Sequence, residues 1–178
     1  MPIISRCTCL WIQHHLAFLR GHVARANPIW QDFAEDVGVL VIFSGPNAYI
    51  SPSWYATKTE TGKVVPTWNY KVVHAYGSLK VIDDAAWLRS NLEALTSQSE
   101  ASFTEQWQVS DAPHAFTEKL IESIVGIEIV ITKLVGKAKV SQNQSPKNRA
   151  SVIQGLTDTG HSDGLLIAAA VESYGKPS

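Results

Sequence analysis

The chain has 178 residues, enough for about one domain with a substantial core. Its 15 Lys and Arg residues nearly balance its 16 Asp and Glu residues, so the net charge of −1 argues against a nucleic-acid or acidic-membrane partner. Apolar residues make up 45% of the chain and charged residues 17%, which excludes a disordered chain and predicts a soluble globular protein.

The N-terminal segment carries no clear targeting signal. Polar residues at positions 13–15 interrupt its apolar run, no small-residue cleavage site follows, and no stretch of the chain reaches the roughly 18 apolar residues of a membrane span. Cys7 and Cys9 are too close together for an easy disulfide and have no standard zinc spacing with the nearby histidines. We therefore expect a cytoplasmic protein without a metal site or a membrane partner.

A helix is predicted after this segment. Asn27 can cap exposed amides, and Pro28 suits the first helical position. The apolar residues that follow share one helical face over about ten residues, up to Gly38. They are Ile29, Phe33 and Val37.

Strands dominate the middle of the chain. Residues 39–43 form a β-branched run, residues 44–47 a turn cluster, and residues 48–51 a second strand, which together predict an antiparallel hairpin. Three more strands are predicted, with Gly77 as a turn or bulge between the last two. They cover residues 63–67, 70–76 and 78–82.

Helices and one more strand follow. Asp84 can cap one helix and Pro113 can open another. Residues 127–132 alternate as a strand with one buried face. The two helices place these residues on their apolar faces: Leu88, Leu92 and Leu95 in the first, and Phe116, Leu120 and Ile124 in the second.

Two short helices are predicted near the C-terminus. They cover roughly residues 148–156 and 165–173, and each is followed by a closing glycine, Gly160 for the first and Gly175 for the second. All the elements together predict an α+β fold, in which a small antiparallel β-barrel removes exposed strand edges and carries helices on its periphery.

Candidate chemistry is concentrated in residues 49–76. Six of these 28 residues are aromatic, about 21%, whereas aromatic residues make up 9% of the whole chain. Hydroxyl, amide and ammonium groups are interleaved with them, among them Lys58, Thr67 and Asn69. Such a segment suits a flat, polar, anionic ligand that stacks on the rings and meets the donors. It equally suits a barrel core whose Trp and Tyr residues hydrogen-bond their polar tips, and the residues alone leave both interpretations open.

A second cluster precedes the first predicted helix. The string RGHVARAN at residues 20–27 places His22 and Arg25 beside a helix N-terminus, where an anion can bind. From the spacing alone, an ordinary surface ion pair of Arg25 is the favoured interpretation.

A third cluster is the string KAKVSQN at residues 137–143. In an extended conformation Lys139, Ser141 and Asn143 share one face, and Gln142 lies on the other. By itself this pattern favours an exposed polar edge.

Five longer strings stand out in chain order: GHVARANPIW (21–30), FSGPNAYISPSWYATK (43–58), VPTWNYKVVHAYG (65–77), IVGIEIVI (124–131) and KVSQN (139–143). They are similar to strings of the PaiB family, bacterial FMN-binding proteins often labelled negative transcriptional regulators of sporulation and protease genes. The match runs in order from about residue 19 to about residue 155. Long strings such as YISPSWY and VPTWNY make it specific to the family.

The resemblance implies an antiparallel split β-barrel related to the pyridoxamine-phosphate-oxidase flavoproteins. It also implies a homodimer that binds FMN at the subunit interface, with His22 and Arg25 facing the phosphate. The other cofactor-binding residues that it implies are Lys58, Thr67, Trp68 and Asn69 along the phosphate and ring, and Lys139, Ser141 and Gln142, which can close the site from the partner subunit.

The N-terminus departs from the family pattern. Family members carry a longer segment with a helix and the first barrel strands, whereas here HHLAFL is joined abruptly to RGH. We therefore separate an atypical segment, residues 1–18, from an FMN-binding split-barrel domain with C-terminal helices, residues 19–178. A missing strand is expected to expose a sheet edge and to weaken both folding and FMN binding.

The family name implies a homodimeric, flavin-dependent negative regulator of transcription. The charge of the chain gives no support to direct DNA contact, because no basic stripe and no helix-turn-helix is evident. Two alternatives stay open. One is a flavin oxidoreductase, for which no acid–base residue stands out, and the other is a haem-binding split-barrel protein that uses one of six histidines.

Overall fold

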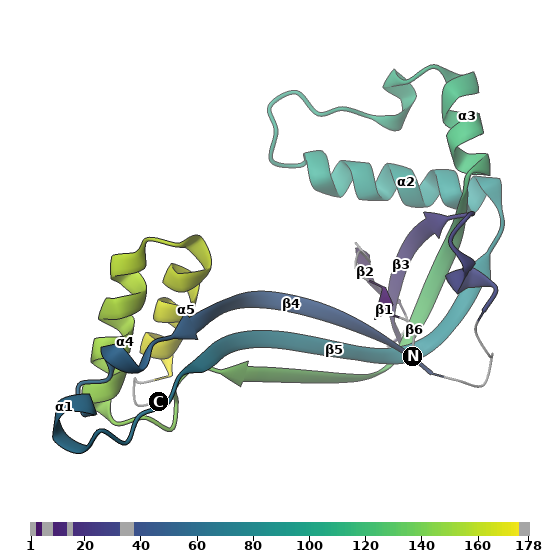
Figure 1. The fold of residues 1–178 in the computed structure, drawn as a ribbon. Helices are drawn as coiled ribbons and strands as arrows, with labels where there is room; N and C mark the ends of the chain where they lie inside the picture. Colours follow the sequence, from purple (N-terminus) through teal and green to yellow (C-terminus); the bar gives the residue numbers. More distant parts are fainter. Residues whose placement is uncertain (1–2, 5–8, 14–15, 33–37, 175–178) are drawn as a thin grey trace. The chain divides into compact units, whose positions relative to one another are not determined.

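The computed structural model describes residues 3–4, 9–13, 16–32 and 38–174 (Figure 1). It divides the chain into two compact units that are interleaved in sequence. Unit 1 comprises residues 1–42 and 74–134, and unit 2 comprises residues 43–73 and 135–178.

The described strands form one sheet in the order β1-β4-β5-β6-β3-β2. β3 pairs antiparallel with both β2 and β6, and β1 pairs parallel with β4. The α+β class with a mainly antiparallel sheet is confirmed. The strands are β1 (Ile3–Ile4), β2 (Cys9–Gln13), β3 (Leu16–Ala24), β4 (Val39–Ile50), β5 (Thr67–Ile82) and β6 (Ile124–Lys139).

The predicted hairpin at residues 39–51 is wrong, because β4 runs unbroken from Val39 to Ile50. Gly45 lets the backbone of β5 come close, since a Cβ at this position would lie 3.1 Å from the carbonyl oxygen of Lys71. Pro46 has no N–H to donate to a neighbouring strand. Among the described residues β1 pairs with β4 only at residues 40 and 41, so the proline stands on an open edge, where strands tolerate it.

β5 also replaces several predicted pieces with one strand. It runs from Thr67 to Ile82, so residues 63–66 are not part of it. Gly77 forms no turn, because the strand continues through it. A Cβ there would lie 2.2 Å from the carbonyl oxygen of Val130, so the glycine permits close approach of β6.

The first predicted helix is confirmed at its start and wrong in its extent. Asn27 accepts a hydrogen bond from the Ile29 amide at 3.0 Å, as a helix cap does, but only one 3-10 turn, η1 (Pro28–Trp30), follows. Residues 31 and 32 form a turn and a bend, while Phe33 and Val37 lie outside the described residues. The Trp30 indole donates to the carbonyl oxygen of Arg25 at 2.9 Å and thereby holds the single turn against the end of β3.

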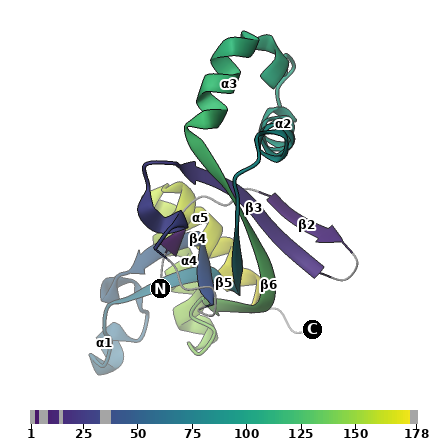
Figure 2. The same ribbon diagram turned by 90° about the vertical axis from the view of Figure 1, so that its right-hand side faces the viewer.

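Two helices of unit 1, α2 (Ala85–Glu100) and α3 (His114–Glu122), contact each other and run in different directions (Figure 2). Asp84 caps α2 as predicted, accepting from the Trp87 amide at 2.7 Å. α3 starts after Pro113 as predicted, but its buried residues are Thr117 and Ile121. The predicted face is wrong by one position, since Phe116 and Leu120 are 57% and 50% exposed and Ile124 already belongs to β6.

The strand predicted at residues 127–132 is confirmed as part of β6, but the prediction that only one of its faces is buried is wrong. Residues 125–129 of β6 are all buried, so both faces are covered there. Glu128 is buried, and its carboxylate accepts from Arg20 Nε at 2.7 Å, which compensates the burial of its charge.

Unit 2 ends in α4 (Pro146–Thr159) and α5 (Ser162–Ser173), which confirm the last two predicted helices. Gly160 ends α4 in the left-handed conformation, at a φ of 67°, and Gly175 lies outside the described residues. Short helices that the sequence did not predict are η2 (Pro52–Trp54), α1 (Lys58–Thr61) and, in unit 1, η3 (Val109–Asp111).

Each unit has a hydrophobic core of its own. The core of unit 1 lies between strands and includes Leu19, Val41 and Ile129. The core of unit 2 joins the ends of β4 and β6 to α4 and α5, for example through Ile50 and Leu156. None of the helices that the structure describes combines the length and apolar character of a membrane span.

Candidate functional site

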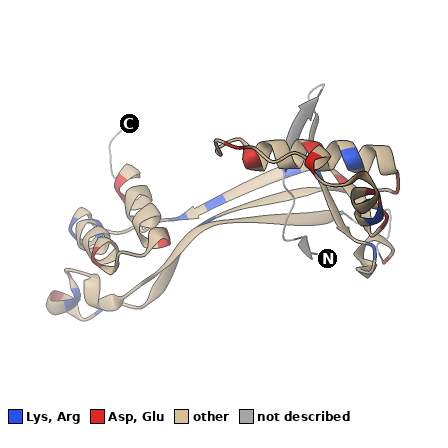
Figure 3. Cartoon of the chain, turned by 90° about the horizontal axis from the view of Figure 1, so that it is seen from above, with Lys and Arg blue, Asp and Glu red and all other residues tan. Residues whose placement is uncertain are grey.

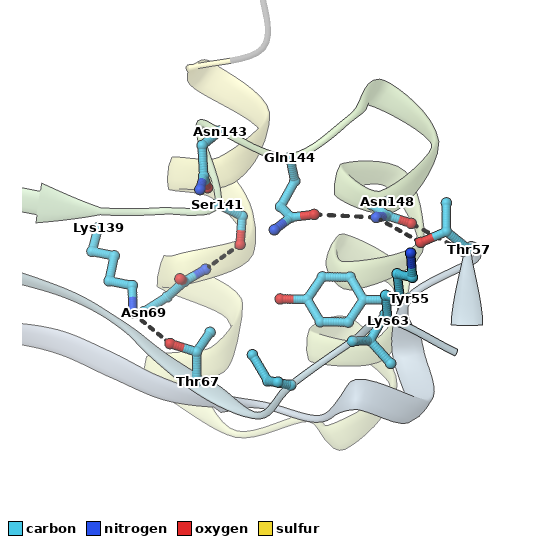
Figure 4. Close-up of a pocket in the computed structure, with 12 residues that line it drawn as sticks. Tyr55, Thr57, Lys63, Thr67, Asn69, Lys139, Ser141, Asn143, Gln144 and Asn148 are labelled. Atoms are coloured by element: carbon cyan, nitrogen blue, oxygen red, sulfur yellow. Dashed lines mark hydrogen bonds between the residues drawn. The ribbon is translucent and has the colours of Figure 1, made fainter. Parts of the chain in front are cut away.

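A polar cavity of about 260 Å³ lies entirely within unit 2 (Figure 4). Its wall comes from the segment after η2, from the start of β5, from the end of β6 and the turn that follows, and from the first turn of α4. The described lining residues are Tyr55, Thr57, Lys63, Val64, Val65, Thr67, Asn69, Lys139, Ser141, Asn143, Gln144 and Asn148.

The end of β6 and the turn that follows bring three polar side chains to the cavity. Ser141 has a φ of 56°, a left-handed conformation that costs a non-glycine residue energy and often marks a functional site. Gln142 stabilises this turn with its side chain, which accepts from the Val140 amide at 2.7 Å and donates to the carbonyl oxygen of Ala138 at 2.8 Å. Lys139, Ser141 and Asn143 consequently line the cavity, and Gln142 does not.

Asn69 lies at the back of the cavity and is fully buried. Its Nδ2 donates to Ser141 Oγ at 2.9 Å, whereas its Oδ1 has no hydrogen-bond partner. A buried polar atom without a partner is rare in folded proteins, because it loses its hydrogen bonds to water without replacement. Beside it, Lys139 Nζ donates to Thr67 Oγ1. The unpartnered Asn69 Oδ1 is a hydrogen-bond acceptor, and it points to a ligand that carries an N–H or O–H group.

The opposite wall is formed by Tyr55 and Asn148. Burial raises the pKa of the Tyr55 phenol, which keeps it protonated, and its hydroxyl points into the cavity (Figure 4). Asn148 is tied to Thr57, donating to Thr57 Oγ1 at 3.1 Å and accepting from the Thr57 amide at 3.2 Å. Asn148 therefore shapes the wall, while Tyr55 offers a free hydroxyl to a ligand.

The cavity suits a ligand with negative charge and many polar atoms. Two lysines, Lys63 and Lys139, line it, and none of the described lining residues is acidic. The remaining polar groups are hydroxyls and amides, which can donate to phosphate oxygens and exchange hydrogen bonds with sugar-like hydroxyls.

The structure brings together four of the predicted cofactor residues: Thr67, Asn69, Lys139 and Ser141. Lys58, at the start of α1, does not line this cavity and donates to Ser53 Oγ at 3.3 Å. The roles of these four residues and of Lys58 toward a cofactor stay predictions.

Trp68 lies on the other side of β5 from Thr67 and Asn69, because successive strand residues face opposite ways. It is 54% exposed and meets Tyr49 edge-on, with ring centroids 5.9 Å apart. Both rings line a separate, mainly apolar pocket of unit 2 together with Trp54. The aromatic rings of Tyr49 and Trp68 and the polar groups of Thr67 and Asn69 thus belong to two different pockets.

His22 and Arg25 belong to unit 1. Burial lowers the pKa of His22, whose Nδ1 has no hydrogen-bond partner. Arg25 donates to both carboxylate oxygens of Asp83, at 2.9 and 2.6 Å. The surface ion pair that the spacing of residues 20–27 favoured is therefore present.

Sequence reasoning assigned no role to several lining residues. Tyr55 and Thr57 lie within the aromatic-rich segment that drew attention, and Asn143 lies in the alternating pattern of residues 137–143. One feature of the sequence could have indicated Gln144 and Asn148. They lie just before and within the first turn of the helix that follows this polar string.

Residues 3–133 match the model of a protein family described as a "Putative FMN-binding domain". The chain belongs to this FMN-binding family. Membership confirms the resemblance to the PaiB family, and FMN is the cofactor that the family binds. The match covers unit 1 and most of the strands of this FMN-binding protein, and it ends before Lys139.

Relatives of this FMN-binding protein match most of its length. An uncharacterized protein of Emericella nidulans is 39% identical, over 89% of this chain and 73% of the relative. The Protease synthase and sporulation protein PAI 2 of Bacillus subtilis is 30% identical, over 87% of this chain and 72% of the relative.

Among solved structures, the flavocytochrome Anf3 of Azotobacter vinelandii is 17% identical, with a TM-score of 0.48 over 74% of this chain and 54% of that chain. An FAD- and heme-binding protein of Mycobacterium smegmatis is 14% identical, with a TM-score of 0.46 over 73% of this chain and 63% of that chain. Scores below 0.5 leave these similarities too weak to support an argument about this FMN-binding protein.

The cavity residues fit FMN in their chemistry. Lys63 and Lys139 match a phosphate, and the unpartnered Asn69 Oδ1 matches a donor on the ribityl chain or the ring. At about 260 Å³ the cavity is below the roughly 300 Å³ of the smallest ligand pockets, so it can enclose only part of the cofactor.

Proposed function

We propose that the chain is a PaiB-type protein that acts as a homodimeric, flavin-dependent negative regulator of transcription. The observation that carries the flavin part of this proposal is the acid-free polar cavity with two lysines and a buried, unpartnered Asn69 oxygen. When bound, FMN supplies one- and two-electron redox chemistry. The chain itself binds and orients the cofactor.

Within the cavity, each group has a separate task. Lys139 and Lys63 neutralise the phosphate, and Asn69 Oδ1 accepts a hydrogen bond from the cofactor. Thr67 holds the Lys139 ammonium group in place, and Gln142 holds the turn that presents Ser141. Gln142 is thus a positioning residue in this proposal.

The regulatory part is proposed to work without direct DNA contact. Figure 3 shows both basic and acidic positions along the ribbon, and the net charge is −1. A DNA-binding surface needs a concentration of Lys and Arg on one face. Flavin binding or flavin reduction is therefore the event that we expect to change the regulatory state, through a partner protein or the dimer.

The first experiment is the visible absorption spectrum of the protein purified without added cofactor, followed by denaturation and identification of the released chromophore. Released FMN supports the proposal. A Soret band would favour the haem-binding alternative. A colourless protein that takes up no added FMN would contradict the proposed cofactor role of the cavity.

The cavity is tested by Lys139→Met. We expect the variant to bind FMN at least tenfold more weakly, about 1.4 kcal/mol, because it loses a cation that faces the ligand. Lys119→Met is the matched control, since Lys119 is exposed on α3 of unit 1 and does not line the cavity. Flavin fluorescence quenching measures both affinities, and equal affinities would place the phosphate elsewhere.

The regulatory proposal is tested by mobility shift on promoter DNA at low salt and by sedimentation of the purified protein. We expect no shift and a dimer. A shift that weakens steeply with added salt would instead indicate direct phosphate contacts.

A further inference from the structure

A second pocket, of about 280 Å³, lies within unit 1 between β3 and α2. It is lined by Arg20, Trp87, Ser90, Asn91 and Ala94. None of these residues belongs to the proposed FMN cavity, and the sequence assigned a role to none of them. The pocket combines a guanidinium group, a carboxamide, a hydroxyl and an apolar wall.

Asn91 is the unusual residue of this pocket. It lies on α2 with 5% of its surface exposed, and neither its Oδ1 nor its Nδ2 has a hydrogen-bond partner. Two unpartnered atoms on one buried amide are unfavourable, because both lose their hydrogen bonds to water. A leucine of similar size would avoid this loss.

Arg20 supplies donors but little net charge. Its Nε donates to Glu128 Oε2 at 2.7 Å, and the guanidinium lies 5.9 Å from the Phe18 ring centre and 5.8 Å from that of Trp87. In the part of the chain that the structure describes, its two terminal nitrogens have no hydrogen-bond acceptor. Because Glu128 already balances the positive charge, these donors suit a neutral carbonyl oxygen better than a second anion.

From these contacts we infer that the pocket is a binding site for a small, neutral, planar carboxamide or lactam. The carbonyl oxygen of the ligand accepts from the terminal nitrogens of Arg20. The Asn91 amide, after turning toward the cavity, donates to and accepts from the ligand amide. Trp87 and Ala94 provide the apolar wall for the rest of the ligand.

The inference is tested with benzamide as the probe and benzoate as its charged counterpart of the same shape. We expect saturable binding of benzamide in an NMR titration, followed through the side-chain amide signals of Asn91. Benzoate should bind at least tenfold more weakly, because its charge meets the compensated Arg20–Glu128 pair. Equal binding of both probes would contradict the recognition of a neutral amide.

Asn91→Leu separates a ligand site from a structural amide. We expect this variant to lose benzamide binding at least tenfold while its melting temperature stays equal or rises, since it removes two unpartnered polar atoms. Ser97→Leu, at an exposed position of the same helix, is the matched control and should bind benzamide as the unchanged protein does. No benzamide binding by the unchanged protein, together with a lower melting temperature of Asn91→Leu, would overturn the inference, because the amide would then be satisfied by ordered water.

Discussion

The side chain of Arg25 connects three parts of unit 1. Its terminal nitrogens donate to Asp83, and Nε donates to the carbonyl oxygen of Glu122 at 2.8 Å. A further bond, 3.1 Å long, reaches the carbonyl oxygen of Ile124. The end of β3 is thereby tied to the start of β6 and to the loop after β5. Because the pair is well exposed, its contribution to stability is screened by solvent.

The Arg25–Asp83 pair predicts a specific pH dependence. The hydrogen bond and charge of Arg25 lower the pKa of the Asp83 carboxyl in the folded state. A lowered pKa contributes stability that is present above the unfolded value of about 3.9 and is lost as the pH falls through the folded value. We expect Asp83→Asn to melt at a lower temperature than the unchanged protein above about pH 5, with the two melting temperatures converging in more acidic buffer.

Thermal unfolding monitored by circular dichroism from neutral to acidic pH checks this expectation. Asp158→Asn is a suitable control, because Asp158 is exposed on α4 and forms no ion pair with a described residue. A gap between Asp83→Asn and the unchanged protein that does not depend on pH would refute the role of the pair.

At the scale of the elements, close strand contacts decide where glycine is needed. β5 and β6 approach so closely at Gly77 that a Cβ would lie 2.2 Å from the Val130 carbonyl oxygen and 2.7 Å from Ile129 Cγ2. Gly136, also within β6, has nothing within 4 Å of the position of a Cβ. The strand contact therefore requires glycine at position 77, whereas the space around position 136 would accept a side chain.

We expect Gly77→Ala to destabilise the protein by about 1–3 kcal/mol, because the strands must move apart around the added methyl group. Gly136→Ala should be neutral or stabilise by up to about 1 kcal/mol, since alanine restricts the unfolded chain more than glycine does. Urea unfolding of both variants gives the two free energies. Similar values at the two positions would show that the contact at Gly77 is relaxed in solution.

At the scale of the whole molecule, the two units divide the proposed ligands between them. Unit 2 holds the polar cavity, and unit 1 holds the carboxamide pocket. Each unit has its own core, so a ligand of one unit stabilises that unit directly.

FMN should therefore stabilise the protein and protect unit 2 locally. At a free FMN concentration of 100 times its Kd, we expect the free energy of unfolding to rise by about 2.7 kcal/mol. Hydrogen exchange should slow most in residues 55–69 and 139–148, which contain the cavity. Riboflavin, which lacks the phosphate, is the control ligand and should protect these residues less. Protection confined to unit 1 would contradict the assignment of the cavity.

Local chemistry determined much of this protein from its sequence. The caps at Asn27 and Asp84, the helix start after Pro113 and the helix end at Gly160 follow from hydrogen bonds and dihedral angles within a few residues. The family strings indicated FMN. Lys139, Ser141 and Asn143 line one cavity without Gln142, but through a turn after β6 and not through the extended alternation that the sequence predicted.

The tertiary structure decided what depends on distant neighbours. The Gly45–Pro46 pair resembles a turn, yet it lies within β4 because the backbone of β5 passes close by and an open edge accepts the proline. Thr67 and Trp68 are adjacent in sequence and face separate pockets, because the strand alternates its side chains. Asn91 gives no signal in the sequence, since only the packing of α2 on β3 leaves its amide buried without a partner.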